Sequence, residues 1–266
     1  MNKRHEHHLV MERELRKAIE EEQFLVYYQP QVDLNTEQII GVEALIRWRH
    51  PQRGMISPAD FIPVSEECGL INSIGEWVLR RTCEDMKSWQ LSGFAPLKVS
   101  VNLSLRQLQE GALFNKISNI LAQNGIAGSR LELELTESVM MDNHAVMLNF
   151  MKQCKDLGIH FSIDDFGTGY SSLSYLMKLP LLDKLKIDRS FIQELSGNND
   201  ASILVSAMVN MAKSLRLEVI AEGVETQEQL NYLRHCGCDS VQGFYFSPPV
   251  SYGELTRLLA QEVLSA

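Results

Sequence analysis

The sequence lacks most of the features that mark membrane-spanning, secreted or disordered proteins. No apolar run approaches the roughly 18 residues needed to cross a bilayer. Residues 1–15 are charged and contain no apolar core, so we expect no signal peptide and no membrane segment. The five cysteines are an odd number without regular spacing, which argues against a disulfide scaffold and favours a reducing, cytoplasmic location.

The charge balance excludes some partners and leaves others open. The chain has 25 Lys and Arg against 34 Asp and Glu, a formal net charge of −9. This charge argues against non-specific binding to DNA or to an anionic membrane. It does not exclude a phosphate substrate, because carboxylates that hold divalent cations leave a site neutral or positive.

The order of the expected elements predicts an α/β barrel. Short β-type runs alternate with amphipathic helical runs from residue 97 to residue 264, which is typical of βαβ units and a parallel sheet. Among these runs we expect a helix over 171–178 and a strand over 239–246. The runs 24–34 and 38–48 flank a short polar turn and predict a hairpin, hence one antiparallel strand. Residues 60–90 read as helical with a break near Gly69. We expect a frayed lead-in over 1–14 and one domain over 15–262, a size typical of such barrels.

One polar residue stands near the carboxyl end of each of five expected strands. Period-2 alternation puts Leu131, Leu133 and Leu135 on one face and Glu132 and Glu134 on the other. The same pattern recurs in the other strands, at intervals close to the roughly 31 residues of one βα unit. The five residues are Asn102, Glu134, Asp164, Lys186 and Glu222. Their spacing predicts a common site at one mouth of a barrel. The alternative is an antiparallel sheet with one face exposed to solvent, in which the alternating polar residues only face water.

The residue types at these positions point to divalent cations. Carboxylate and amide oxygens suit Mg²⁺ or Mn²⁺, and no cluster of Cys and His has zinc spacing. The adjacent Asp164 and Asp165 can both reach one site only where their strand ends, and an aspartate there can bridge two ions. Lys186 amid carboxylates should stay protonated, which argues against a Schiff-base lysine.

Eight short motifs resemble those of one enzyme family. They are EALIRW at 43–48, YQP at 28–30, VNLS at 101–104, ELTE at 134–137, DDFGTG at 164–169, LKID at 185–188, AEGVE at 221–225 and QG at 242–243. In this order and spacing they resemble the EAL-domain cyclic di-GMP phosphodiesterases. The resemblance runs from about Leu15 to Leu259.

The resemblance implies a fold, a reaction and roles for particular residues. It implies a modified (β/α)8 TIM-type barrel with one antiparallel strand, and Mg²⁺- or Mn²⁺-dependent hydrolysis of cyclic di-GMP to the linear dinucleotide. Two ions would be held by Glu43, Asn102, Glu134, Asp164, Asp165 and Glu222. Glu222, Lys186 and Glu43 match catalytic positions, and Glu137 matches the residue that anchors the DDFGTG loop. Substrate contacts match Gln29, Leu45, Arg47, Asp188, Glu225 and Gln242. The family also implies a homodimer.

Two questions stay open at this stage. The segment Pro180–Lys186 reads as one residue longer than usual, so a bulge must absorb Leu181 or Leu182 if Lys186 is to keep its register. A catalytically silent cyclic di-GMP receptor is the alternative to an active hydrolase, although every matched metal ligand is present. An unrelated metal-dependent barrel is a third reading, which the order of the motifs disfavours.

Overall fold

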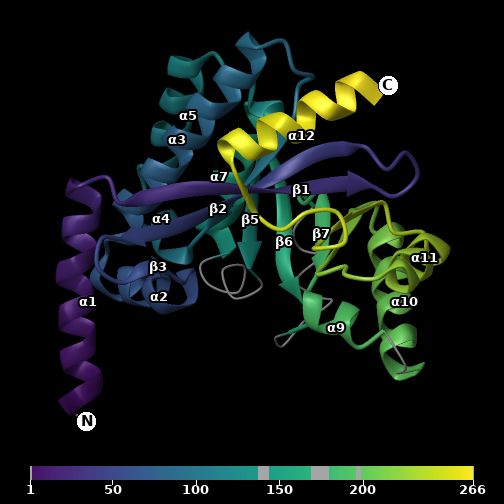
Figure 1. The fold of residues 1–266 in the computed structure, drawn as a ribbon, viewed down its shortest axis with the longest axis horizontal. Coiled ribbons are helices and arrows are strands. Elements are labelled where there is room, and N and C mark those ends of the chain that lie inside the picture. The colour runs from purple at the N-terminus through teal and green to yellow at the C-terminus, as the bar shows by residue number, and fades with distance from the viewer. Residues whose placement is uncertain (1, 137–143, 169–179, 196–198, 266) are drawn as a thin grey trace.

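The computed structural model describes residues 2–136, 144–168, 180–195 and 199–265 (Figure 1). The strands are β1 Phe24–Asp33, β2 Ile39–His50, β3 Gly54–Ile56, β4 Lys98–Leu103, β5 Leu131–Thr136, β6 His160–Phe166, β7 Lys184–Ile187, β8 Glu218–Glu222, β9 Ser240–Gln242 and β10 Val250–Ser251. The helices are α1 Asn2–Glu20, α2 Pro58–Cys68, α3 Ile71–Leu91, α4 Leu105–Gln109, α5 Leu113–Asn124, the 3-10 turn η1 Gly128–Arg130, α7 His144–Asp156, α9 Arg189–Gln193, α10 Asn199–Ser214, α11 Gln227–Cys236 and α12 Tyr252–Ser265.

The sheet closes into the predicted barrel with one antiparallel strand. Neighbouring strands run parallel from β2 through β4 to β9 in sequence order. Strand β1 is antiparallel to both β2 and β9, and it joins the two ends of the parallel series. The pairing of Gln29 with Glu43 lies within the predicted hairpin, which is confirmed. The fold class expected from the sequence is therefore correct.

The core lies between the barrel and the helices packed around it. The side chains of Val99, Val101 and Leu133 are at most 5% exposed, and they belong to the apolar strand faces identified in the sequence. Helices α3, α7, α10 and α12 contact β4, β6, β7 and β1 respectively. The apolar faces therefore point outward to helices, which leaves the polar faces inside the barrel.

Local signals explain the boundaries of the helices near residue 69. Pro58 stands in the first turn of α2, where its missing N–H is not needed. Gly69 adopts φ 80° and donates its N–H to the carbonyl of Glu66, which ends α2. A residue with a Cβ is strained at that φ, so glycine suits the break that the sequence predicted.

Two expectations were wrong. Residues 2–20 form α1 and are not a frayed lead-in, because Met11, Leu15 and Ala18 recur at helical spacing and are at most 1% exposed. The strand expected over 239–246 ends at Gln242, since the next residues turn back and the Tyr245 N–H donates to the Val224 carbonyl. The helix expected over 171–178 lies outside the described residues.

The arrangement of strand ends defines one functional face. In Figure 1 the arrowheads of β5 and β6 point to the lower edge, where α9 lies, and α12 lies at the upper edge. Because the strands β4 to β8 are parallel, their carboxyl ends meet at the same mouth. Helix α1 runs along one side of the molecule, next to α2.

Candidate active site

The polar residues predicted at the strand ends do meet at one mouth of the barrel. Asn102 on β4 pairs in register with Glu134 on β5, and Glu222 on β8 pairs with Gln242 on β9. The Nδ2 of Asn102 donates to Glu43 Oε1 at 2.8 Å, which brings β2 into the same group. The predicted convergence is therefore confirmed.

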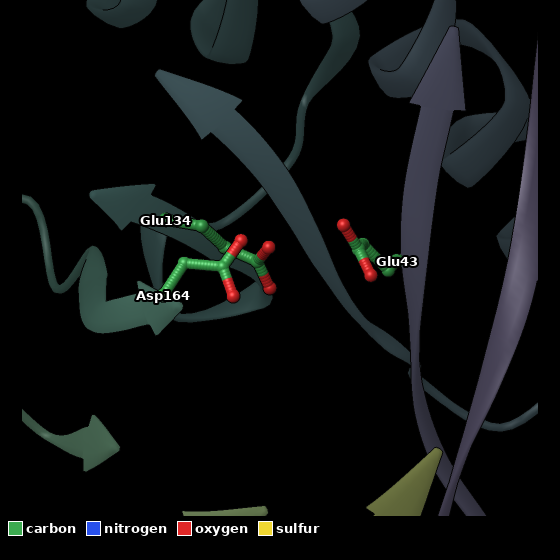
Figure 2. Close-up of side chains that lie close together, drawn as sticks. All are labelled: Glu43, Glu134 and Asp164. Carbon is green, nitrogen blue, oxygen red and sulfur yellow. The ribbon is translucent and has the colours of Figure 1, made fainter. Parts of the chain in front are cut away.

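Three carboxylates form the first potential cation site. One ligand oxygen each from Glu43, Glu134 and Asp164 lies within 4.8 Å of the others. Figure 2 shows the carboxyl groups of Glu134 and Asp164 side by side, with that of Glu43 facing them from another strand. The three residues are 5%, 1% and 9% exposed, so water screens their mutual repulsion poorly.

A second carboxylate group shares Asp164 with the first. One oxygen each from Asp164, Asp165 and Glu222 also lies within 4.8 Å of the others. Asp165 adopts φ 55°, and the pairing of β6 with β7 shifts register between Ile163 and Phe166. This irregularity is what lets two consecutive aspartates reach one site, since regular strand geometry would direct them to opposite faces.

Lys186 lies at the centre of both groups. Its Nζ is 2.6 Å from Glu134 Oε2, 2.8 Å from Glu222 Oε1 and 3.1 Å from Asp164 Oδ1. Burial alone would lower the pKa of this ammonium, but the carboxylates around it, first Asp164 and then Glu134, raise its pKa well above the ordinary value. Lys186 therefore stays protonated, as predicted.

The extra residue before β7 does not displace Lys186. A turn at 180–181 precedes the strand, and Leu182 is buried. From Lys184 onward β7 pairs regularly with β8. The additional length is thus taken up before the strand begins.

The pKa values of the carboxyl groups diverge strongly. Burial raises the pKa of Glu134 well above its ordinary value, and the charge of Glu43 adds to the effect. Burial likewise raises the pKa of Glu222 to about 8, despite the opposing charge of Lys186. For Glu43 burial is outweighed by Lys186 and by the amides that donate to it, so its pKa is lowered. Burial and then the charge of Asp164 raise the pKa of Asp165.

The donor set fits hard divalent cations. Two groups of three carboxylates offer oxygen ligands, and the Glu134 Oε1 atom is buried without a hydrogen-bond partner among the described residues. A buried acceptor without a donor is costly, and a cation would satisfy it. The pKa values of Glu134, Asp165 and Glu222 are raised first by burial and then by the charges of neighbouring carboxylates, and a bound cation would offset both effects.

A cavity of about 300 Å³ opens beside these groups. The predicted substrate residues Gln29, Leu45, Glu225 and Gln242 line it, together with Glu43, Asp164 and Glu222. The Nε2 of Gln242 donates to Gln29 at 3.0 Å and to Glu43 at 2.5 Å, which links this wall to the carboxylates.

Three other predicted residues lie differently. Arg47 lines a separate cavity of about 450 Å³ that Leu45 and Asn102 also border. Asp188 caps α9 by accepting hydrogen bonds from the N–H and hydroxyl of Ser190. Glu137 lies outside the described residues, so its role as a loop anchor stays a prediction.

Sequence reasoning missed several residues at or near the site. Arg189 and Phe244 line the 300 Å³ cavity; Arg189 lies one residue beyond Asp188, and Phe244 lies two residues beyond Gln242. That adjacency to a strand end is the signal that could have found them. Below the site, Lys184 forms a buried ion pair with Glu132 at 2.8 Å.

Fold and site together define an α/β barrel with a carboxylate-rich site of the kind that holds divalent cations. The family model of the EAL domain matches residues 12–249, and the chain therefore belongs to the EAL domain family. It is 43% identical over 260 residues to the bifunctional diguanylate cyclase/cyclic di-GMP phosphodiesterase MucR of Pseudomonas aeruginosa, covering 98% of this chain and 38% of MucR. It is also 43% identical over 251 residues to the cyclic di-GMP phosphodiesterase NbdA of the same organism, covering 94% of this chain and 32% of NbdA.

Solved structures agree with this assignment. The PaMucR phosphodiesterase in complex with c-di-GMP matches with a TM-score of 0.88 and 44% identity, over 92% of this chain and 99% of that chain. The EAL enzyme Bd1971 bound to cAMP and cyclic di-GMP matches with a TM-score of 0.92 and 33% identity, over 97% of this chain and 70% of that chain. The chain spans about a third of the length of the curated relatives it matches. Among the described residues, no helix combines the length and apolar character needed to cross a membrane.

Proposed function

We propose that this chain hydrolyses one phosphodiester of cyclic di-GMP and releases linear 5′-phosphoguanylyl-guanosine. The observation that carries the proposal is the sharing of Asp164 between two carboxylate groups beside one cavity. A shared aspartate is typical of sites that hold two metal ions for phosphoryl transfer. The relatives named for this activity and the structures with the bound dinucleotide support the choice of substrate.

Two ions, Mg²⁺ or Mn²⁺, fit the two groups. Glu43, Asn102, Glu134 and Asp164 would hold one, and Asp164, Asp165 and Glu222 the other. When bound, the ions supply positive charge that polarises water and the phosphate oxygens. All of these ligands are present in the sequence, whereas a receptor without activity is expected to lose some of them.

The protein's own groups would manage the proton and the developing charge. Glu222 lines the cavity beside the carboxylates, where its carboxylate would accept a proton from the attacking water. The oxygen of that water would bond to phosphorus while the P–O3′ bond breaks, the leaving O3′ oxygen would take a proton from solvent, and Glu222 would return its proton to solvent. Lys186 would stabilise negative charge and orient the water, because it stays protonated.

The cavity walls would position the dinucleotide. Gln29, Leu45, Glu225 and Gln242 line the cavity beside the carboxylates, and Arg47 stands at the neighbouring cavity, where its charge suits a phosphate. Asp188 fixes the start of α9 at the same mouth. A homodimer and a cytoplasmic location remain predictions from the sequence.

The test is product formation from cyclic di-GMP with Mg²⁺ or Mn²⁺, followed by chromatography. Wild type should release the linear dinucleotide, and chelation should stop it. Glu43→Gln and Glu222→Gln should each lower kcat by about 100-fold or more, while the surface variant Glu12→Gln should match wild type. Thermal melts check that the variants fold. Tight binding without turnover in wild type would contradict the hydrolase and support the receptor.

A further inference from the structure

Two residues of the 300 Å³ cavity have no role in the proposed reaction. Arg189 begins α9, and Phe244 follows β9 by two residues. Both line the cavity together with Glu222 and Glu225. They are of the two residue types that most often recognise purine bases, a guanidinium and an aromatic ring.

The backbone around these two residues is tightly built. A Cβ placed on Gly223 would lie 2.5 Å from the Cβ of Arg189, so the loop after β8 packs directly on the first residue of α9. A Cβ placed on Gly243 would lie 2.1 Å from the carbonyl oxygen of Val224. The N–H of Tyr245 also donates to that carbonyl at 2.9 Å. Arg189 therefore packs against Gly223, and the residues on either side of Phe244 pack against Val224 of the same loop.

The side chains are free to meet a ligand. Phe244 is 65% exposed, although Val241 and Gln242 just before it are at most 4% exposed. An exposed phenyl ring is unfavourable in water, and at the lip of a cavity it gains stability when a flat ligand covers it. Arg189 is also exposed, and it lines the same cavity.

We propose that Arg189 and Phe244 form a subsite for one guanine base of the substrate, with Phe244 stacking on the base and Arg189 donating to its O6 and N7. This inference rests on the proposed function. Guanine presents two acceptors, O6 and N7, on one edge, and a guanidinium matches them with two parallel hydrogen bonds. Adenine carries an amino group in place of O6, so the same arginine meets a donor there. The pair would thus select the base and not merely hold the dinucleotide.

The experiment compares cyclic di-GMP with cyclic di-AMP as probes. Phe244→Leu keeps an apolar side chain but removes the ring, and should raise KM for cyclic di-GMP about tenfold or more. Because the lost contact is made equally before and during the reaction, kcat should change less than about twofold. Phe244→Trp keeps the ring and should stay within about threefold of wild type. Arg189→Gln should reduce the preference for cyclic di-GMP over cyclic di-AMP about tenfold. The controls are Leu91→Ala and Arg80→Gln, at exposed positions on the outer helix α3.

Each outcome decides one part. Equal losses on both dinucleotides in Arg189→Gln would mean that the arginine binds a phosphate, and would overturn its part in base selection. A KM for Phe244→Leu within about twofold of wild type, or a fall in kcat alone, would overturn the stacking. If the wild type binds cyclic di-GMP without turnover, the same variants are compared with it by Kd in place of KM. A wild type that neither binds nor cleaves cyclic di-GMP refutes the proposed function itself, before any variant is compared.

Discussion

The ion pair below the active site allows a sharp test of the barrel interior. Lys184 on β7 and Glu132 on β5 are 3% and 0% exposed, with Nζ 2.8 Å from Oε2 and 3.0 Å from Oε1. Ser100 on β4 donates to the same carboxylate at 3.0 Å. Lys184→Met keeps most of the side-chain volume but leaves the carboxylate of Glu132 buried without its cation.

The expected loss of stability is large. Removing one partner of a buried ion pair costs about 3–5 kcal/mol, because the remaining charge is both desolvated and uncompensated. With 266 residues and about 2.1 cal/mol/K of unfolding entropy per residue, that loss lowers Tm by roughly 5–9 °C. The double variant Glu132→Leu with Lys184→Met removes both charges and should recover most of the stability, since a matched apolar pair is often neutral.

The loss should also depend on pH. Burial raises the pKa of Glu132, but Lys184 outweighs this, so the wild-type pKa is lowered. Without Lys184 only the smaller effects of Lys98 and Ser100 oppose burial, so the pKa of Glu132 rises and the carboxyl group takes up a proton as the pH falls. The single variant is therefore destabilised more at pH 8 than at pH 5. Urea unfolding at both pH values, beside the exposed control Lys87→Met, measures this. A Lys184→Met loss under about 1 kcal/mol, or a double variant as unstable as the single one, would refute the reasoning.

Two further predictions concern the site, and a third concerns the stability of the core. The apparent affinity for Mn²⁺ should rise with pH up to about 8, because Glu222 must lose its proton to become a ligand. Calorimetry should also detect the release of protons on binding. An affinity independent of pH would contradict this. Gly243→Ala should reduce kcat/KM by about tenfold or more, since the added Cβ would lie 2.1 Å from the Val224 carbonyl oxygen and must displace the loop after β8. Unchanged kinetics would show that the loop can move without affecting the site. Tyr28→Phe should cost about 1–3 kcal/mol in urea unfolding, as Asp85 loses a buried 2.7 Å hydrogen bond; an unchanged midpoint would contradict that value.

Much of the site was predictable because its residues follow local patterns. The alternation in β5 directs Glu134 inward, and one polar residue recurs near the end of each parallel strand. Once a barrel is assumed, residues at corresponding strand ends must be neighbours. The same periodicity failed at 239–246, because the turn after β9 depends on the Val224 carbonyl, which is far away in sequence.

By itself, the sequence determined the order of strands and helices, the hairpin and the set of residues that converge, since periodicity and spacing are local properties. Only the tertiary structure decided which of these residues lie together and which lie apart. The left-handed φ of Asp165 and the register shift in β6 bring two consecutive aspartates to one site. The pairing of Lys184 with Glu132, and the separation of Arg47 from the cavity of Gln29, depend on how strands far apart in sequence are staggered around the barrel. Stagger is set by closure of the whole sheet, a long-range condition that no short stretch of sequence contains.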